Sequence, residues 1–400
     1  MSHAPPLGAL LRQYAAGSAL TCDPVDQGLL NRGYRLRTTR GRYFLKHHFD
    51  PETADPAAIA RQHRATQRLA DLGVPVAPPL AGTDGRTVAV VGGHAYALHP
   101  WIDGRHRHGG QLTTEQCARL GALLGVVHAS LEQVMPVQAG GPARPPADTL
   151  PPAGALSSTG ALSSTGAVPA AGALPSAGAL SSAGAPPRAG ALPSARALPS
   201  GDAAPVDGAV PADGADPVDT FALIDHLLAR VRRHRPTDSF DELARHRLLE
   251  RRVLLERHAD RRPPRGGCVG WVHGDFHPFN LLYRDGEPAA IVDWDRLGVQ
   301  PRAEEAVRAA MIFFVRPVGT LDLTKVRAYA RAYRRTAGAT PSELAAAVHR
   351  VWWERLNDFW ILRWHYERGD TRADPQFPAA SALAVWWTRE YEPVCEAFTR

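Results

Sequence analysis

Apolar and polar positions alternate through much of the first hundred residues. In residues 28–46, apolar side chains recur at every second position on both sides of a turn at 40–41, which predicts a β-hairpin. Residues 86–102 predict two further strands joined through a Gly-Gly turn, whereas residues 56–72 have the spacing of an amphipathic helix. We therefore expect a small, mostly antiparallel sheet with one helix.

Helical periodicity dominates after about residue 113. Trp352, Trp353, Trp360 and Trp364 recur at helical separations, so we interpret them mainly as core residues; a substrate-stacking role for one of them is the alternative. Besides a first helix in 113–134, we expect helices at 220–234, 240–258, 302–315, 322–337, 341–368 and 379–397.

The segment 137–219 has a different composition from the rest of the chain. Glycine recurs every six residues from Gly154 to Gly190, in units such as "GALSST" and "GALPSA". A six-residue repeat is also found in β-helices. Few residues of a unit could fill a core, however, and proline occurs at varying places within units. We therefore predict a disordered Ala/Gly/Pro/Ser insertion, because such a sequence buries too little apolar area to offset its ordering entropy.

Composition and charge narrow the class of protein. The chain has 400 residues, 44% hydrophobic and 22% charged, which is typical of globular proteins. Neither a membrane-spanning run nor a signal peptide is recognisable, and four widely separated cysteines favour a reducing compartment, so we expect a cytoplasmic protein without a membrane partner. The net charge of +6 comes largely from arginines in 229–265, which alternate with acidic residues at helical spacing. A solvated helix face explains them better than nucleic-acid binding.

Lysine is rare in this chain. Of 46 basic residues only Lys46 and Lys325 are lysines, and Lys46 ends an expected strand. A compact ammonium contacts phosphates differently from a planar guanidinium, so a lysine retained among so many arginines points to a phosphate-binding role. The alternative is an ordinary charge at the end of a strand.

The stretch "WVHGDFHPFN" (271–280) contains the densest set of reactive side chains. Asp275 precedes Asn280 by five positions, and Asp293 follows across an expected hairpin with its turn at 285–286. In phosphoryl transfer, one carboxylate orients the attacking hydroxyl, while an amide oxygen and a second carboxylate hold magnesium against the nucleotide phosphates. The three residues together predict this chemistry.

His273 and His277 offer a competing interpretation, because a spacing of four residues is also that of a helical zinc pair. Gly274 and Pro278 favour a loop instead of a helix, and a clear third ligand is absent nearby. We therefore expect His273 and Gly274 to support the loop, and His277 to line the site.

The motifs "VHGDFHPFN" and "IVDWD" resemble the signature of the aminoglycoside phosphotransferase and choline kinase-like family of small-molecule kinases. "GLLNRGYRL…RYFLK" resembles the family's nucleotide loop and lysine strand, and "YALHPWIDGR" its hinge between lobes. "LGALLGVVHASL" resembles the first helix of its large lobe. The resemblance implies an α+β, two-lobed protein-kinase-like fold. Its small N-lobe would span 1–100, and its mostly helical C-lobe would span 101–136 and 220–400, interrupted by the low-complexity insertion.

The resemblance also implies roles for individual residues. Asp275 would be the catalytic base, Asn280 and Asp293 the magnesium ligands, and Lys46 the contact to the α- and β-phosphates of ATP or GTP. The other expected nucleotide-site residues are Asn31, Gln62, Leu98, His99 and Trp101. The candidate substrate residues are His277, Asp295, Glu305, Trp360 and Asp358. The expected partner is a small molecule with a hydroxyl group, bound to a monomer or weak homodimer.

Two positions depart from the family pattern. The small-lobe helix usually has a glutamate that pairs with the lysine; Gln62 occupies the matching position, with Glu52 and Asp55 as possible substitutes. After the second motif, Glu304 or Glu305 replaces the Asp of the usual "DLA" segment.

The acceptor stays open at this stage. The last hundred residues mix acidic residues and arginines instead of forming a clearly acidic surface, so an aminoglycoside, an amino alcohol such as choline or homoserine, and a sugar are all compatible with the sequence. A catalytically silent nucleotide-binding protein is the alternative from another functional class.

Overall fold

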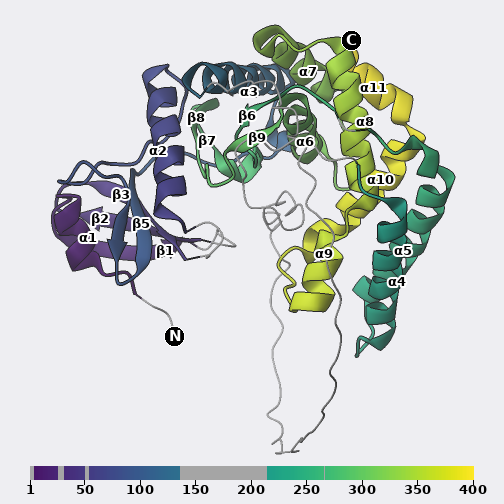
Figure 1. Cartoon of the computed structure of the whole chain (residues 1–400), viewed down its shortest axis with the longest axis horizontal. Helices are drawn as coiled ribbons and strands as arrows, with labels where there is room; N and C mark the ends of the chain where they lie inside the picture. The colour runs from purple at the N-terminus through teal and green to yellow at the C-terminus, as the bar shows by residue number, and fades with distance from the viewer. Residues whose placement is uncertain (1–3, 26–30, 50–53, 136–213, 265) are drawn as a thin grey trace, which may run out of the picture. The chain divides into compact units, whose positions relative to one another are not determined.

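The computed structural model describes residues 4–25, 31–49, 54–135, 214–264 and 266–400 (Figure 1). Its N-terminal part is an antiparallel sheet of five strands in the order β1-β2-β3-β5-β4. The strands are β1 (Ala19–Val25), β2 (Arg32–Thr38), β3 (Arg42–His48), β4 (Ala89–Val91) and β5 (His94–Pro100), and the helices of this part are α1 (Leu7–Gln13) and α2 (Pro56–Asp71). The predicted small sheet with one main helix is confirmed, and the sequence interpretation missed β1 and the short α1.

The two faces of this sheet have different surroundings. Leu45 of β3 and Leu98 of β5 are cross-strand partners, and both are buried in a small core against α1. Side chains alternate along a strand, so Lys46 and its partner Ala97 lie on the opposite face. The lysine is thus held on a rigid strand whose other side is anchored by apolar packing.

The C-terminal part is mainly helical and has one large core (Figure 1). Its helices are α3 (Thr114–Val134), α4 (Pro217–Arg233), α5 (Ser239–Arg257), α6 (Arg302–Phe314), α7 (Leu323–Ala337), α8 (Pro341–Asn357), α9 (Trp360–Arg363), α10 (Phe377–Arg389) and α11 (Tyr391–Thr399). Two short antiparallel pairs accompany them: β6 (Val269–Val272) with β9 (Gly298–Pro301), and β7 (Leu281–Arg284) with β8 (Glu287–Ile291).

Two ranges that were each predicted as one continuous helix are divided into shorter helices in the structure. The range 341–368 divides into α8, α9 and a π-helical segment at Trp364–Arg368 (the π-segment), because Asp358 has an extended backbone and its carboxylate accepts the N–H of Trp360. The range 379–397 divides at Glu390, where α10 ends and α11 begins. Apolar periodicity continues across both breaks, which explains why the pattern did not reveal them.

The predicted insertion falls almost entirely outside the described residues. Its last six positions, 214–219, are described: Asp216 caps α4, and the helix begins at Pro217, three residues before the expected start. The four tryptophans assigned to the core, Trp352, Trp353, Trp360 and Trp364, are all buried, which confirms their main role. In the described part of the chain no helix has both the length and the apolar character needed to cross a bilayer.

Helices α3 and α7 pack closely at Gly121. A Cβ atom at this position would lie 2.1 Å from the carbonyl oxygen of Tyr329. We expect Gly121→Ala to lower the free energy of unfolding by about 1–3 kcal/mol, since the two backbones must separate. Urea unfolding measures this change. Gly8→Ala is the control, because in α1 the nearest atom to a new Cβ is a flexible guanidinium nitrogen 3.6 Å away; wild-type stability for Gly121→Ala would contradict the prediction.

Candidate active site

The loop 273–280 begins directly after β6 and depends on a glycine. Gly274 has φ +82°, and a Cβ atom there would lie 2.1 Å from the carbonyl oxygen of Arg296. Only glycine combines this backbone conformation with such a close approach. Gly274 therefore fixes the direction of the chain immediately before Asp275, as its predicted supporting role requires.

Glu305 holds the same loop in place. Its carboxylate accepts the backbone N–H groups of His273 (3.2 Å) and Gly274, and Nε2 of His128 lies 2.7 Å from its Oε2. Burial opposes the ionisation of Glu305, but the hydrogen bonds from His128 and from the loop backbone, together with the nearby histidines, outweigh burial and lower the pKa. These contacts favour a positioning role over the substrate contact that the sequence suggested. His128 was missed, although a histidine on the apolar face of an expected helix was a visible signal.

His273 braces the loop as a neutral ring. Its Nε2 lies 3.0 Å from the carbonyl oxygen of Val292, and its Nδ1 accepts the N–H of Asp275 at 3.2 Å. One nitrogen therefore donates and the other accepts, which is the pattern of an uncharged imidazole. Burial lowers the pKa of His273 and maintains that state. This geometry supports the predicted structural role.

Asp275 lies between His277 and Asn280. The Oδ2 atom of Asp275 is 3.5 Å from Nε2 of His277, and its carbonyl oxygen accepts the amide N–H of Asn280 at 2.8 Å. Burial opposes the ionisation of Asp275, yet the neighbouring His277 and Arg296 together lower its pKa below the ordinary value. Asp275 is therefore a carboxylate at neutral pH, the form that accepts a proton.

A hairpin brings Asp293 to this loop. Strands β7 and β8 pair across the predicted turn at 285–286, and the carbonyl oxygen of Asn280 accepts the N–H of Val292 at 2.9 Å. Asp293 follows with φ +61°, a conformation that is uncommon for residues other than glycine. Such backbone strain persists where the surrounding structure over-determines it, and it is concentrated at functional sites.

Lys46 connects the sheet to Asp293 and Asp295. Its Nζ atom lies 2.7 Å from Oδ1 of each aspartate, although the residues are far apart in sequence. Burial would lower the pKa of Lys46, but the two carboxylates outweigh burial and raise it. For Asp293 burial acts in the opposite sense, and the Lys46 ammonium outweighs it and holds the pKa well below its usual range.

Asp295 provides the carboxylate that the small-lobe helix lacks. It also accepts a hydrogen bond from the Asn31 amide, and its carbonyl oxygen accepts the Gln62 amide N–H at 2.9 Å. Gln62 thus contacts the backbone of Asp295, one of the two carboxylate partners of Lys46. Asp55 caps α2 through the N–H groups of residues 57 and 58, and Glu52 lies outside the described residues. Sequence reasoning had placed Asp295 only among the substrate candidates.

The other predicted nucleotide residues are distributed over both faces of the sheet. The Leu98 side chain is in the core on the face opposite Lys46. His99 lies on the face of Lys46, with Nδ1 2.9 Å from the carbonyl oxygen of Ala77. Trp101 borders a cavity of about 420 Å³, lined also by Arg35, Arg37, Arg42 and residues 102–104. Cross-strand pairing places these arginines on the same face as Lys46, whereas the Leu98 side chain is on the other face.

The remaining substrate candidates are enclosed in the helical part. Trp360 is buried, and Asp358 forms an ion pair with Arg355 at 2.9 Å. The neighbouring carboxylates are paired as well, each lying within 4.0 Å of a basic nitrogen: Glu354, Glu367, Asp370 and Asp374. These positions leave little unpaired negative charge for a polycation.

The residues fit a magnesium ion chemically. The Asn280 side-chain nitrogen donates a hydrogen bond to the Asp275 carbonyl oxygen. The amide oxygen of Asn280 is therefore the atom that would bind a cation. Asp293 is ionised and half exposed. An amide oxygen and a carboxylate oxygen are hard ligands of the kind magnesium prefers.

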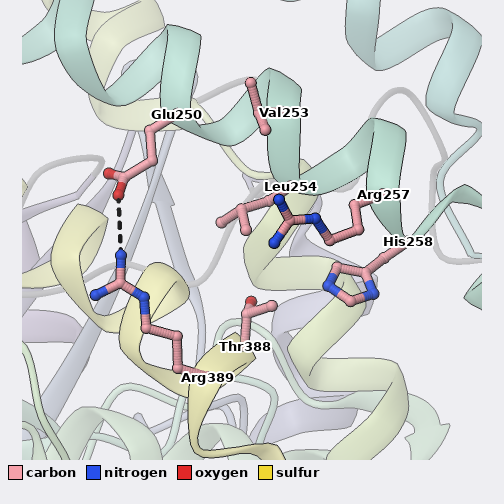
Figure 2. A pocket seen from close by; sticks show the side chains of 7 residues that line it. All are labelled: Glu250, Val253, Leu254, Arg257, His258, Thr388 and Arg389. Atoms are coloured by element: carbon pink, nitrogen blue, oxygen red, sulfur yellow. Dashed lines mark ion pairs between the residues drawn. The ribbon is translucent and has the colours of Figure 1, made fainter.

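A second cavity lies away from this set. It has a volume of about 450 Å³ and lies between α5 and α10, where Glu250 and Arg389 form an ion pair at 3.7 Å (Figure 2). Its lining is Glu250, Val253, Leu254, Arg257, His258, Thr388 and Arg389, which includes none of the predicted site residues.

Lys46 on a strand of the five-stranded sheet lies beside Asp293, which a hairpin joins to the loop 273–280. This arrangement is that of a protein-kinase-like fold. The family model described as "Phosphotransferase enzyme family" matches residues 21–339, and the chain belongs to this family.

Solved structures with the same fold cover nearly the whole chain. An amicoumacin kinase in complex with AMP-PNP, Ca²⁺ and Ami has a TM-score of 0.52 at 14% identity and covers 98% of this chain and 95% of its own. A spectinomycin phosphotransferase in complex with ADP and spectinomycin has a TM-score of 0.53 at 12% identity, covering 98% and 96%. A microcompartment-associated aminopropanol kinase has a TM-score of 0.52 at 13% identity, covering 98% and 99%. At these identities the likeness concerns the fold, and it confirms the predicted two-lobed class.

Curated relatives match a shorter region. The homoserine kinase of Neisseria meningitidis serogroup B is 31% identical over 118 residues, which is 30% of this chain and 37% of that protein. The homoserine kinase of Bartonella tribocorum is 26% identical over 126 residues, or 32% and 38%. The chain therefore spans just over a third of the length of the curated relatives it matches.

Proposed function

We propose that the protein is an ATP-dependent phosphotransferase that moves the γ-phosphoryl group to a hydroxyl of a small molecule. The observation that supports this most directly is the convergence of Lys46 and Asp293, 2.7 Å apart, next to a loop that presents Asp275 as a carboxylate. A charged lysine, an ionised metal ligand and a base are the groups that this reaction requires.

Each residue has one role in the proposed reaction. Asp275 orients the acceptor hydroxyl and takes its proton as the oxygen forms a bond to phosphorus and ADP leaves. Magnesium, held by Asn280 and Asp293, would neutralise charge on the phosphates. Lys46 binds the α- and β-phosphates, and Asp295 fixes its ammonium in place of a helix glutamate. His273, Gly274 and Glu305 keep the loop in position.

Within the acceptor classes, the ion pairing in the helical part favours a small amino alcohol over a polycationic aminoglycoside. The carboxylates that would attract several ammonium groups are already paired with arginine or histidine. The homoserine kinases and the aminopropanol kinase among the similar proteins agree in chemical class with this choice.

A substrate panel tests the proposal. Purified protein is incubated with ATP or GTP, Mg²⁺ and one candidate from the set homoserine, aminopropanol, choline, spectinomycin and simple sugars, and products are measured by mass spectrometry. We expect ATP- and Mg²⁺-dependent addition of one phosphoryl group, with the highest kcat/KM for an amino alcohol. Nucleotide binding without turnover of any panel member would favour the silent nucleotide-binding alternative.

A further inference from the structure

Two histidines and an aspartate meet in the helical part, where the proposed phosphotransfer reaction does not use them. His234 ends α4, Asp241 lies in the first turn of α5, and His365 belongs to the π-segment. One possible ligand atom from each lies within 4.8 Å of the other two. Three separate segments therefore direct nitrogen and oxygen donors to one point.

One of the three separations already suits a tetrahedral cation, and the two that involve His365 are within 4.8 Å. Nδ1 of His234 lies 3.0 Å from Oδ2 and 3.1 Å from Oδ1 of Asp241. With metal–ligand bonds of about 2.0–2.1 Å, neighbouring ligands in a tetrahedron are about 3.3 Å apart. A metal ion replacing the proton between His234 and Asp241 thus requires only a small adjustment of this pair.

His365 has the support that metal-binding histidines usually have. Its Nδ1 atom lies 2.8 Å from Oδ2 of Asp374, which leaves Nε2 as the nitrogen for a cation. Phe240 stacks on the ring at a centroid distance of 4.2 Å and an angle of 17°. A carboxylate behind the ring fixes its tautomer and raises its basicity as a ligand.

Asp241 is fixed in a similar way. It is 1% exposed, and it accepts hydrogen bonds from the Tyr366 hydroxyl at 2.6 Å and from the backbone N–H of Asp238 at 3.0 Å. By contrast, the His234 side chain is 37% exposed, which gives an entry path from solvent.

We propose that His234, Asp241 and His365 form a binding site for a divalent transition-metal ion of the zinc class, with Asp374 orienting His365. Two imidazoles and one carboxylate are a ligand set typical of zinc, and the fourth position would be taken by water. A neutral His234 ring with its proton on Nε2 would present the Nδ1 lone pair to the metal, and the metal would then take the place of the hydrogen bond to Asp241. The ion would fasten the α4–α5 connection to the π-segment.

The competing interpretation is a metal-free set of His–Asp hydrogen bonds, and direct titration distinguishes the two. The full-length protein is stripped with a chelator, and Zn²⁺ alone is titrated by calorimetry, with Co²⁺ absorption reporting tetrahedral coordination. We expect one equivalent bound with micromolar or tighter affinity and a higher Tm with Zn²⁺.

Variants assign the metal to this site. We expect His365→Gln to weaken Zn²⁺ binding at least 100-fold and Asp374→Asn to weaken it by about 10–100-fold. His246→Gln, at an exposed position on α5, should bind as the wild type does, and so should Asp293→Asn, which removes a proposed magnesium ligand. If His365→Gln does not fold, as judged by circular dichroism, His234→Gln at the open side of the site replaces it.

Three results would overturn the proposal. The first is the absence of Zn²⁺ binding at about 100 µM metal by the folded wild type. The second is full retention of one equivalent in the folded His365→Gln or His234→Gln variant, because the metal would then occupy another site. The third is loss of Zn²⁺ binding in Asp293→Asn alone, which would place the metal at the phosphotransfer site. None of these results depends on the kinase reaction.

Discussion

Asp275→Asn is expected to lower kcat by about 10²–10⁴-fold while nucleotide affinity stays close to that of the wild type. The reason is that asparagine keeps the size and the loop contacts of the side chain but cannot accept the proton of the acceptor hydroxyl. Because the pKa of Asp275 lies below its ordinary value, the wild type has the base available throughout the neutral range. Steady-state kinetics with the best acceptor from the panel, combined with nucleotide titration, measures both quantities.

A matched control lies in the neighbouring hairpin. Asp285→Asn makes the same chemical change at an exposed turn with φ +51°, a conformation that asparagine tolerates. Its kcat should equal that of the wild type. Equal turnover by Asp275→Asn and Asp285→Asn would show that Asp275 is not the base, and the proposed mechanism would fail.

Local motifs made part of the candidate site predictable. Asp275, Asn280 and Asp293 are joined by one short hairpin, whose turn and apolar strands are visible in the sequence and whose geometry places them together. Lys46 could be singled out because lysine is so rare in the chain, not because the pattern showed its partners. The family resemblance gave it a contact to the α- and β-phosphates, and its approach to Asp293 was not predicted.

Contacts between distant segments were the part that the sequence could not provide. The bond from Gln62 to the Asp295 backbone spans 233 residues, and the contact of His128 with Glu305 spans 177. Such pairs depend on how the sheet and helices pack. The local sequence around either residue does not indicate which distant residue it contacts. For the same reason the sequence did not show which carboxylate replaces the helix glutamate that usually pairs with the lysine. In the structure Asp295, from another segment of the chain, provides that carboxylate to Lys46.

Acidification from pH 7 to 5 is expected to destabilise the protein by up to about 2 kcal/mol for each of three histidines in the N-terminal part, two of them buried and one partly buried. Burial is the main cause of their low pKa values, which are about 2 for His48, about 3 for His63 and about 4 for His99. The nearby Lys46 acts in the same direction on all three. They are therefore neutral in the folded protein over this whole range.

The sign follows from proton binding. An unfolded histidine has a pKa of about 6.5, so below that pH the unfolded chain binds protons that the folded protein does not. Stability is greatest above about pH 6.5 and falls by about 1.4 kcal/mol per pH unit and per histidine until the folded pKa is reached. Carboxylates near their ordinary pKa protonate mainly below about pH 5. Asp295 is the exception, because burial raises its pKa to about 6, and its protonation partly offsets the loss of stability from the histidines.

Urea unfolding at a series of pH values tests this, with His63→Gln as the informative variant. The His63 ring is buried, with Nδ1 2.8 Å from the Thr87 hydroxyl, and glutamine is a polar replacement that does not titrate. The variant should be less stable at pH 7 but lose less stability on acidification, by about one histidine's share. His246→Gln, at an exposed position, should keep the wild-type slope. An unchanged slope in His63→Gln would show that this ring takes up its proton without unfolding, and the acid sensitivity would then need another source.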